Sequence, residues 1–93
     1  MSRPLREVEI GPEPLDLREV LARIGRGLGF PSWWGHNLDA LFELLVEEVA
    51  GPVRIRWRLA PPRPGSDLEA LWNTLRAAAR EREDLELRVE AGD

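Results

Sequence analysis

Three short stretches in which apolar and charged residues alternate constrain this chain more than any other feature. They are Arg6–Ile10, Val53–Arg58 and Leu85–Glu90, and within each stretch the apolar side chains fall on one side. A period of two residues is typical of a β-strand that buries one face and leaves the other in water. The sequence therefore predicts a sheet that is covered on one side only.

Helical patterns fill the segments between these strands. Apolar residues recur at intervals of three and four, and each run follows a residue that can cap a helix N-terminus. The first helix should fray at Gly25, Gly27 and Gly29, because glycine is a poor helix former. The second should stop before Gly51-Pro52. The predicted helices are Leu17–Leu28 after Asp16, Asn37–Ala50 with Asn37 as its cap, and a third after Ser66 that reaches about Ala79.

The order strand, helix, helix, strand, helix, strand predicts an α/β fold with two layers. Helical crossovers between all strands make the sheet parallel, and the alternating pattern places the helices on one face. The exposed residues of the middle stretch are arginines, whereas those of the outer stretches are mainly acids. Favourable cross-strand pairs then place the second strand in the centre, in the order 1-2-3. With 93 residues, we expect a single domain over residues 1–93.

The net charge of −4 lies in one segment of the chain. Residues Gly27 to Val53 contain no arginine and four acids, whereas the thirteen acids outside this segment are balanced by thirteen arginines. Localised charge of one sign attracts a partner of the opposite sign. A basic protein is therefore the favoured partner, and nucleic acid is disfavoured because its phosphates would be repelled.

Asp39, Glu43 and Glu47 form an acidic row along the predicted second helix, each four residues from the next. Like charges at this spacing destabilise a helix, and Glu47 and Glu48 also lie near its negative C-terminus. Folding alone would not select this arrangement, although a soluble polar face is the simple alternative. A carboxylate pair such as Asp39 and Glu43 could also serve acid–base catalysis or bind a divalent ion, but a convex helix offers neither a cleft nor further ligands.

Two adjacent tryptophans, Trp33 and Trp34, immediately precede this helix. Neighbouring side chains in a loop rarely point into the same core, so we predict that Trp33 is exposed and Trp34 buried. The alternative is that both pack beneath the loop. An exposed tryptophan beside a charged helix is typical of a protein-binding hot spot.

Residues suited to catalysis are scarce. The chain has one histidine, no cysteine, lysine or tyrosine, and no glycine motif that follows a strand to hold phosphate. His36, in a loop beside Gly35, is more typical of a structural or solvated residue than of a base. We therefore predict a protein that is not an enzyme and has no cofactor or metal. The absence of a signal-peptide pattern, of a membrane-length apolar run and of cysteine favours a cytoplasmic protein without membrane contact.

The segment Phe30 to Glu43, FPSWWGHNLDALFE, resembles the barstar family, intracellular inhibitors of secreted barnase-type ribonucleases. The shared pattern is a proline, an aromatic pair, a glycine, Asn-Leu-Asp-Ala-Leu, an aromatic residue and an acid, and a looser similarity covers most of the chain. The family is itself a standard example of steered, hot-spot binding. The resemblance implies a barstar-like fold of three parallel strands with helices on one face.

The resemblance also implies a function and a set of contact residues. The protein would occlude the active site of a basic ribonuclease or nuclease-like toxin, with Asp39 and Glu43 as phosphate mimics, and would be a monomer when free. The alternative is an adaptor that binds a basic protein other than a nuclease with the same face. The predicted partner-binding residues are Trp33, Gly35, Asn37, Leu38, Asp39, Phe42, Glu43, Val46 and Glu47.

Three positions depart from the family pattern. Glu43 stands where the family has aspartate, Glu48 replaces an aromatic residue, and Ala77 replaces an acid of the last helix. These changes shift negative charge along the surface, so we expect a partner whose cations are arranged differently.

Overall fold

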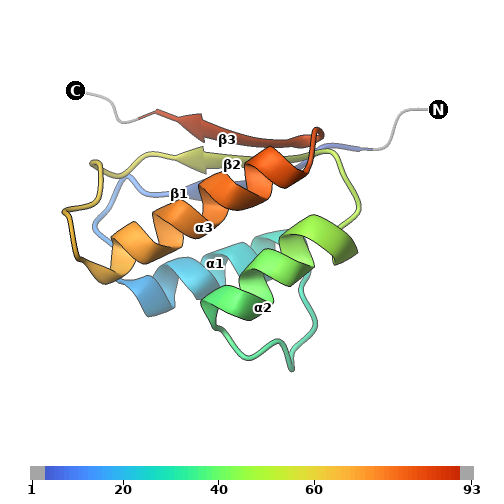
Figure 1. The fold of residues 1–93 in the computed structure, drawn as a ribbon, viewed down its shortest axis with the longest axis horizontal. Helices are drawn as coiled ribbons and strands as arrows, with labels where there is room; N and C mark the ends of the chain where they lie inside the picture. The colour runs from blue at the N-terminus through green and yellow to red at the C-terminus, as the bar shows by residue number, and fades with distance from the viewer. Residues whose placement is uncertain (1–3, 91–93) are drawn as a thin grey trace.

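The computed structural model describes residues 4–90 and has a sheet on one side and helices on the other (Figure 1). This arrangement follows from the one-sided strands, because only their apolar face has to be covered by helices. The elements are β1 (Arg6–Ile10), α1 (Leu17–Leu28), α2 (Leu38–Glu43), a π-helical turn η1 (Leu44–Glu48), β2 (Val53–Trp57), α3 (Asp67–Glu81) and β3 (Leu85–Val89).

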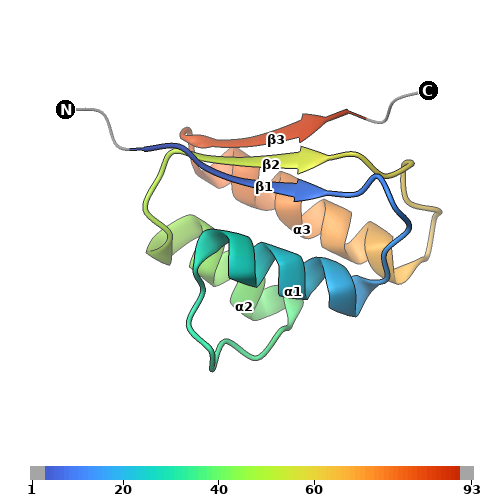
Figure 2. The same cartoon turned by 180° about the vertical axis from the view of Figure 1, so that it is seen from behind.

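The three strands form a parallel sheet in the order β1-β2-β3, which confirms the predicted fold class and strand order. The register aligns Val8 with Ile55 and Ile55 with Leu87, so that the apolar residues of all three strands share one face. α1 packs mainly on β1, and α3 packs on β3 and on α2 (Figures 1 and 2). The core between the layers includes Ile10, Ile24, Leu28, Ile55, Trp57, Leu71 and Leu75, each no more than 2% exposed.

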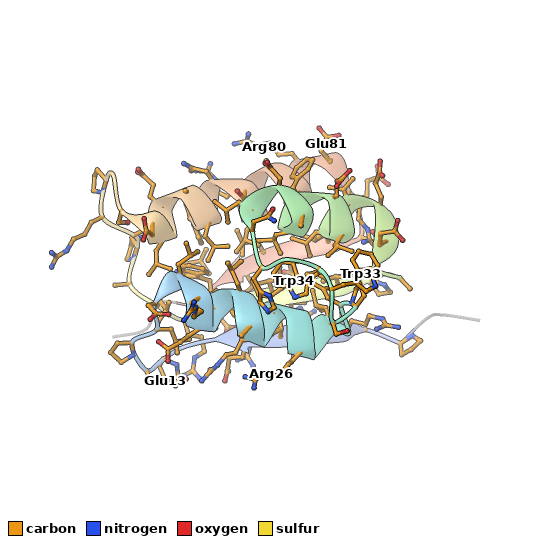
Figure 3. All side chains as sticks on the ribbon, turned by 90° about the horizontal axis from the view of Figure 1, so that it is seen from below. Glu13, Arg26, Trp33, Trp34, Arg80 and Glu81 are labelled. Carbon is orange, nitrogen blue, oxygen red and sulfur yellow. The ribbon has the colours of Figure 1, made fainter. Side chains whose placement is uncertain are left out.

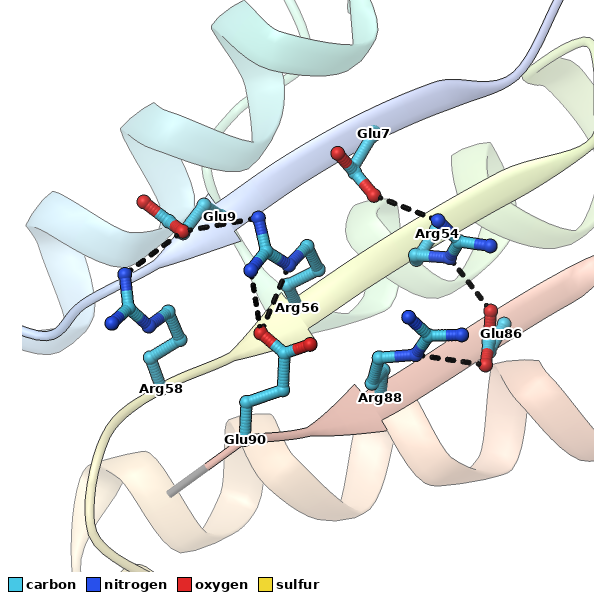
Figure 4. A network of polar contacts seen from close by, with 8 residues as sticks. All are labelled: Glu7, Glu9, Arg54, Arg56, Arg58, Glu86, Arg88 and Glu90. Atoms are coloured by element: carbon cyan, nitrogen blue, oxygen red, sulfur yellow. Dashed lines mark hydrogen bonds and ion pairs between the residues drawn. The ribbon is translucent and has the colours of Figure 1, made fainter. Parts of the chain in front are cut away.

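The open face of the sheet carries a network of ion pairs (Figure 4). Arg54 on the central strand joins both neighbours, with its Nε 2.8 Å from Glu86 Oε1 and its Nη1 3.1 Å from Glu7 Oε2. These are the cross-strand pairs that the sequence predicts, and they also hold the strand order in place. The other pairs are Arg56 with Glu9 and Glu90, Arg58 with Glu9, and Arg88 with Glu86.

α1 does not fray at Gly25 and Gly27, so that prediction was wrong. A Cβ atom at Gly25 would lie 2.9 Å from Trp34 Nε1, and one at Gly27 would lie 2.8 Å from Val8 Cγ2. The two glycines therefore let the helix approach the aromatic loop and β1 closely, and this packing offsets their low helix propensity. α1 ends only at Gly29, whose φ of 73° provides a left-handed cap.

The second helix is neither a single α-helix nor as long as predicted. α2 changes into η1 after Glu43, and Val49 is already extended, with ψ 126°. The amide of Val49 donates to the carbonyl of Leu44 at 2.9 Å, a bond across five residues that widens the turn. Together α2 and η1 lie beneath α3, on the side away from the sheet (Figure 1).

Candidate protein-binding site

The loop between α1 and α2 separates its two tryptophans as predicted. Trp33 is 79% exposed, whereas Trp34 is 5% exposed (Figure 3). The Trp34 ring lies 5.1 Å from the Phe30 ring and 4.6 Å from the His36 ring, measured between centroids. Because Trp34 fills the space against Gly25, the adjacent Trp33 is left in solvent.

The backbone after Trp34 turns sharply into α2. Gly35 and His36 both have positive φ angles, of 84° and 52°, in the region that favours glycine. This turn allows the Asn37 side chain to accept a hydrogen bond of 2.8 Å from the Ala40 amide, so Asn37 caps α2. His36 is exposed, and its ring contacts the Trp34 ring at a tilt of 39°, which fits the expected structural or solvated residue.

Four exposed acids follow the cap along α2 and η1, and together they are called the acidic face below. Within residues 4–90, none of the four forms an ion pair, whereas each acid on the open face of the sheet is paired. The contrast does not come from exposure alone, because Glu7 and Glu86 are also exposed. The acidic face consists of Asp39, Glu43, Glu47 and Glu48.

A hollow and a groove flank this helix. The loop-side hollow, about 510 Å³ in volume, lies between the aromatic loop and the helix and is bordered by Trp33, Glu43, Glu47 and Glu48. The α3-side groove lies between α2 and α3 and is lined by Leu38, Asp39, Phe42, Glu43, Asn73, Thr74 and Ala77. Glu43 borders both.

One comparison with known proteins identifies the family. A family model described as Barstar (barnase inhibitor) matches residues 8–92, nearly the whole chain. The chain belongs to the barstar family. At the level of this family, its function is inhibition of barnase-type ribonucleases, and its members are inhibitors and not enzymes. No curated protein matches the chain significantly.

Most of the predicted partner-binding residues line the two depressions that flank the second helix. Leu38, Asp39 and Phe42 share the α3-side groove, and Leu38 and Phe42 are only half-buried. Trp33 and Glu47 share the loop-side hollow. Gly35 and Asn37 shape the turn between them, and Val46 is half-buried and borders neither depression.

Arg82, beyond the end of α3, is a supporting residue that the sequence analysis missed. Its Nη1 donates to the carbonyl of Leu45 in η1 at 2.7 Å, and its Nε lies 2.6 Å from Asp84 Oδ1. A cation at the C-terminal turn opposes the negative end of the helix dipole and satisfies a carbonyl there. No local signal could have indicated this contact, because the two partners are 37 residues apart.

Metal and membrane sites have no support in the part of the chain that the structure describes. Residues 4–90 contain no group of three or more His, Asp or Glu side chains placed to hold a metal ion. No helix among these residues is long and apolar enough to cross a membrane.

Proposed function

We propose that the protein inhibits a basic barnase-type ribonuclease by covering the enzyme's active site with its acidic face and aromatic loop. The observation that carries the proposal is the difference between two sets of acids. The acids of the sheet are neutralised within the fold, whereas those of the acidic face point to solvent beside an exposed tryptophan. Unpaired carboxylates of this kind suit cations supplied by a partner.

The proposed mechanism is occupation without chemistry. A ribonuclease holds the phosphates of RNA with arginine and lysine side chains, and Asp39 and Glu43 would take the place of those phosphates. Charge-assisted hydrogen bonds to these cations are short and about twice as strong as neutral ones. RNA is then excluded, because the groups that bind its backbone are already satisfied.

The remaining residues supply fit. Trp33 is a rigid apolar anchor, and Leu38 and Phe42 offer apolar area beside Asp39 in the α3-side groove. Gly35 and Asn37 set the angle between loop and helix, so they control whether the tryptophan and the carboxylates can reach one partner together. Val46 and Glu47 extend the contact surface by a further turn.

The test is inhibition of a barnase-type ribonuclease by the wild type and by Asp39→Ala and Glu43→Ala. Each variant should bind at least about 2 kcal/mol more weakly, because a desolvated cation loses its partner. The melting temperature should stay constant or rise slightly, since each truncation relieves like-charge repulsion on the helix. Glu81→Ala is the matched control, because Glu81 is exposed at the end of α3 and lines neither the hollow nor the groove. Unchanged affinity in both test variants would contradict the assigned surface.

The adaptor hypothesis uses the same surface for a basic protein that is not a nuclease. Glu48 and Ala77 support this hypothesis, because both alter the charge pattern that the family resemblance implies. The adaptor hypothesis predicts that barnase-type ribonucleases remain fully active at saturating concentrations of the protein. It also predicts that the Asp39→Ala variant no longer binds the basic partner that the wild type captures.

A further inference from the structure

We propose that the loop-side hollow receives the side chain of one arginine of the partner, between Trp33 and the carboxylates of η1. The inference rests on the proposed function, in that it takes the partner to be a basic protein. It adds the residue type that this partner must present at one position, and it concerns the hollow alone. The α3-side groove is not involved.

The lining of the hollow has two chemical halves. Its walls are mainly apolar and include Leu28, Phe30 and Val49, whereas its rim carries Glu43, Glu47 and Glu48. A side chain that fits both halves must have an apolar stem and a charged head. Arginine and lysine share that form, so a basic side chain is the complementary occupant.

Trp33 decides between these two cations. Trp33 is 79% exposed and borders the hollow, so its indole is accessible for stacking. A planar guanidinium stacks on an aromatic face and can still donate sideways to a carboxylate, whereas an ammonium is a strongly hydrated point charge. The combination of ring and carboxylates therefore selects arginine over lysine.

Two adjacent acids border the same hollow, and both lie in the π-helical turn. In a regular α-helix, neighbouring side chains diverge around the axis. Here η1 is wider and ends directly after Glu48, and Glu47 and Glu48 both border the hollow. The extra carboxylate at Glu48, where the family has an aromatic residue, thus has a place in this site.

One cation of the chain itself, Arg6, also borders the hollow, but its hydrogen bond is to the backbone of the wall and not to the acids of the rim. Arg6 donates from Nη1 to the carbonyl of Leu28 at 3.4 Å, at the end of α1. Within residues 4–90 it forms no ion pair with Glu43, Glu47 or Glu48. The carboxylates of the rim therefore remain available to a partner.

The experiment titrates the full chain with the capped tripeptides acetyl-Gly-Arg-Gly-amide and acetyl-Gly-Lys-Gly-amide, followed by nuclear magnetic resonance. The arginine peptide should shift the Trp33 indole N–H and the amides of Gly29 and Ala50, at millimolar concentrations expected for one side chain. The lysine peptide should bind about threefold more weakly. Trp33→Ala and Glu47→Gln should each reduce the affinity for the arginine peptide.

Asp39→Asn is the matched control, because Asp39 lines only the α3-side groove. It should leave the peptide shifts unchanged while it weakens nuclease inhibition. The inference is overturned if the arginine peptide shifts none of these signals at tens of millimolar, if lysine binds equally well, or if Trp33→Ala and Glu47→Gln have no effect. Loss of nuclease inhibition in Asp39→Asn together with any of these results leaves the proposed function standing and removes only the arginine site.

Discussion

Glu43 lies between the two depressions that flank the acidic face. It borders both the loop-side hollow and the α3-side groove, and its side chain is one methylene longer than the aspartate that the resemblance implies at this position. Ala77, where the resemblance implies an acid, lies in the same α3-side groove. Both departures therefore act at one place on the surface.

We predict that Glu43→Asp combined with Ala77→Glu slows dissociation from a barnase-type ribonuclease. A carboxylate displaced by one bond length leaves a buried cation under-satisfied, at about 1–3 kcal/mol, so the wild type should dissociate roughly five- to 150-fold faster than the double variant. Association should change little and fall steeply with salt, because it depends on the summed field of the acidic face, screened over about 8–10 Å. Stopped-flow measurement gives both rate constants.

Glu43→Asp with Ala77→Gln is the control for that pair, since it matches the size of the second change without its charge. An equally slow dissociation of the wild type would show that the surface is not adapted to a different partner.

Gly35 supports a second prediction at this scale. Gly35→Ala should destabilise the fold by about 1–2 kcal/mol, because an L-residue is strained at its φ of 84°. The new Cβ would also lie 3.1 Å from Asn37 Nδ2 and disturb the helix cap. Gly65→Ala is the matched control, with φ 80° but nothing within 4 Å of the added atom. Urea unfolding should show a larger loss for Gly35→Ala than for Gly65→Ala, and equal losses would mean that the cap is unaffected.

At the scale of elements, η1 depends on a contact with Arg82, a residue that follows α3. Arg82 is largely buried, donates to the Leu45 carbonyl and is oriented by Asp84. The turn therefore does not stand on helix propensity alone. Its position beside the hollow is set by the residues that follow α3.

We predict that Arg82→Ala lowers the free energy of unfolding by about 1–3 kcal/mol, since a carbonyl in η1 loses its donor. Amide exchange should accelerate at Glu48 and Val49, where the turn ends. Arg80→Ala is the control, because Arg80 is exposed on α3, and its effect should stay within about 0.5 kcal/mol. Exchange at η1 that is equal in both variants would argue against this anchoring role.

For the molecule as a whole, charge is divided between two opposite sides. The open face of the sheet is an interlocked array of arginine and glutamate, whereas the acidic face on the helical side has no internal counter-ions among residues 4–90. The first arrangement serves the fold, and the second leaves a negative field for a partner. Since the two lie on different layers, each can change without the other.

This division predicts how stability depends on pH. The hydrogen bond from Arg54 holds the pKa of Glu86 below its ordinary value of 4.5, and Arg88 adds to the effect. A lowered pKa in the folded state gives stability that is present above pH 4.5 and is lost as the pH falls through the folded value. Urea unfolding should therefore show decreasing stability on acidification below that pH.

The variant Glu86→Gln should show a shallower loss of stability with acid than the wild type, whereas Glu81→Gln, outside the network, should not. An identical pH dependence in the wild type and Glu86→Gln would exclude this contribution. Binding through the acidic face involves other residues and should be unchanged by Glu86→Gln at neutral pH.

The sequence by itself determined the features that local periodicity encodes. Alternation along three strands required a sheet with one covered face, and the charges on its open side set the order of the strands. The exposure of Trp33 and the cap at Asn37 also followed from neighbouring residues. These features depend on which way each side chain faces, and the spacing of apolar and polar residues along the chain indicates that direction.

Only the tertiary structure decided where packing overrides local preference. Gly25 and Gly27 lie inside α1 because Trp34 and Val8 need the space that a Cβ atom would occupy. The change from α2 to η1, and the hollow beside it, depend on contacts with the aromatic loop and with Arg82, 37 residues from Leu45. Periodicity indicates which side of an element is buried, but the groups that bury it come from distant parts of the chain, and their shapes determine where a helix ends.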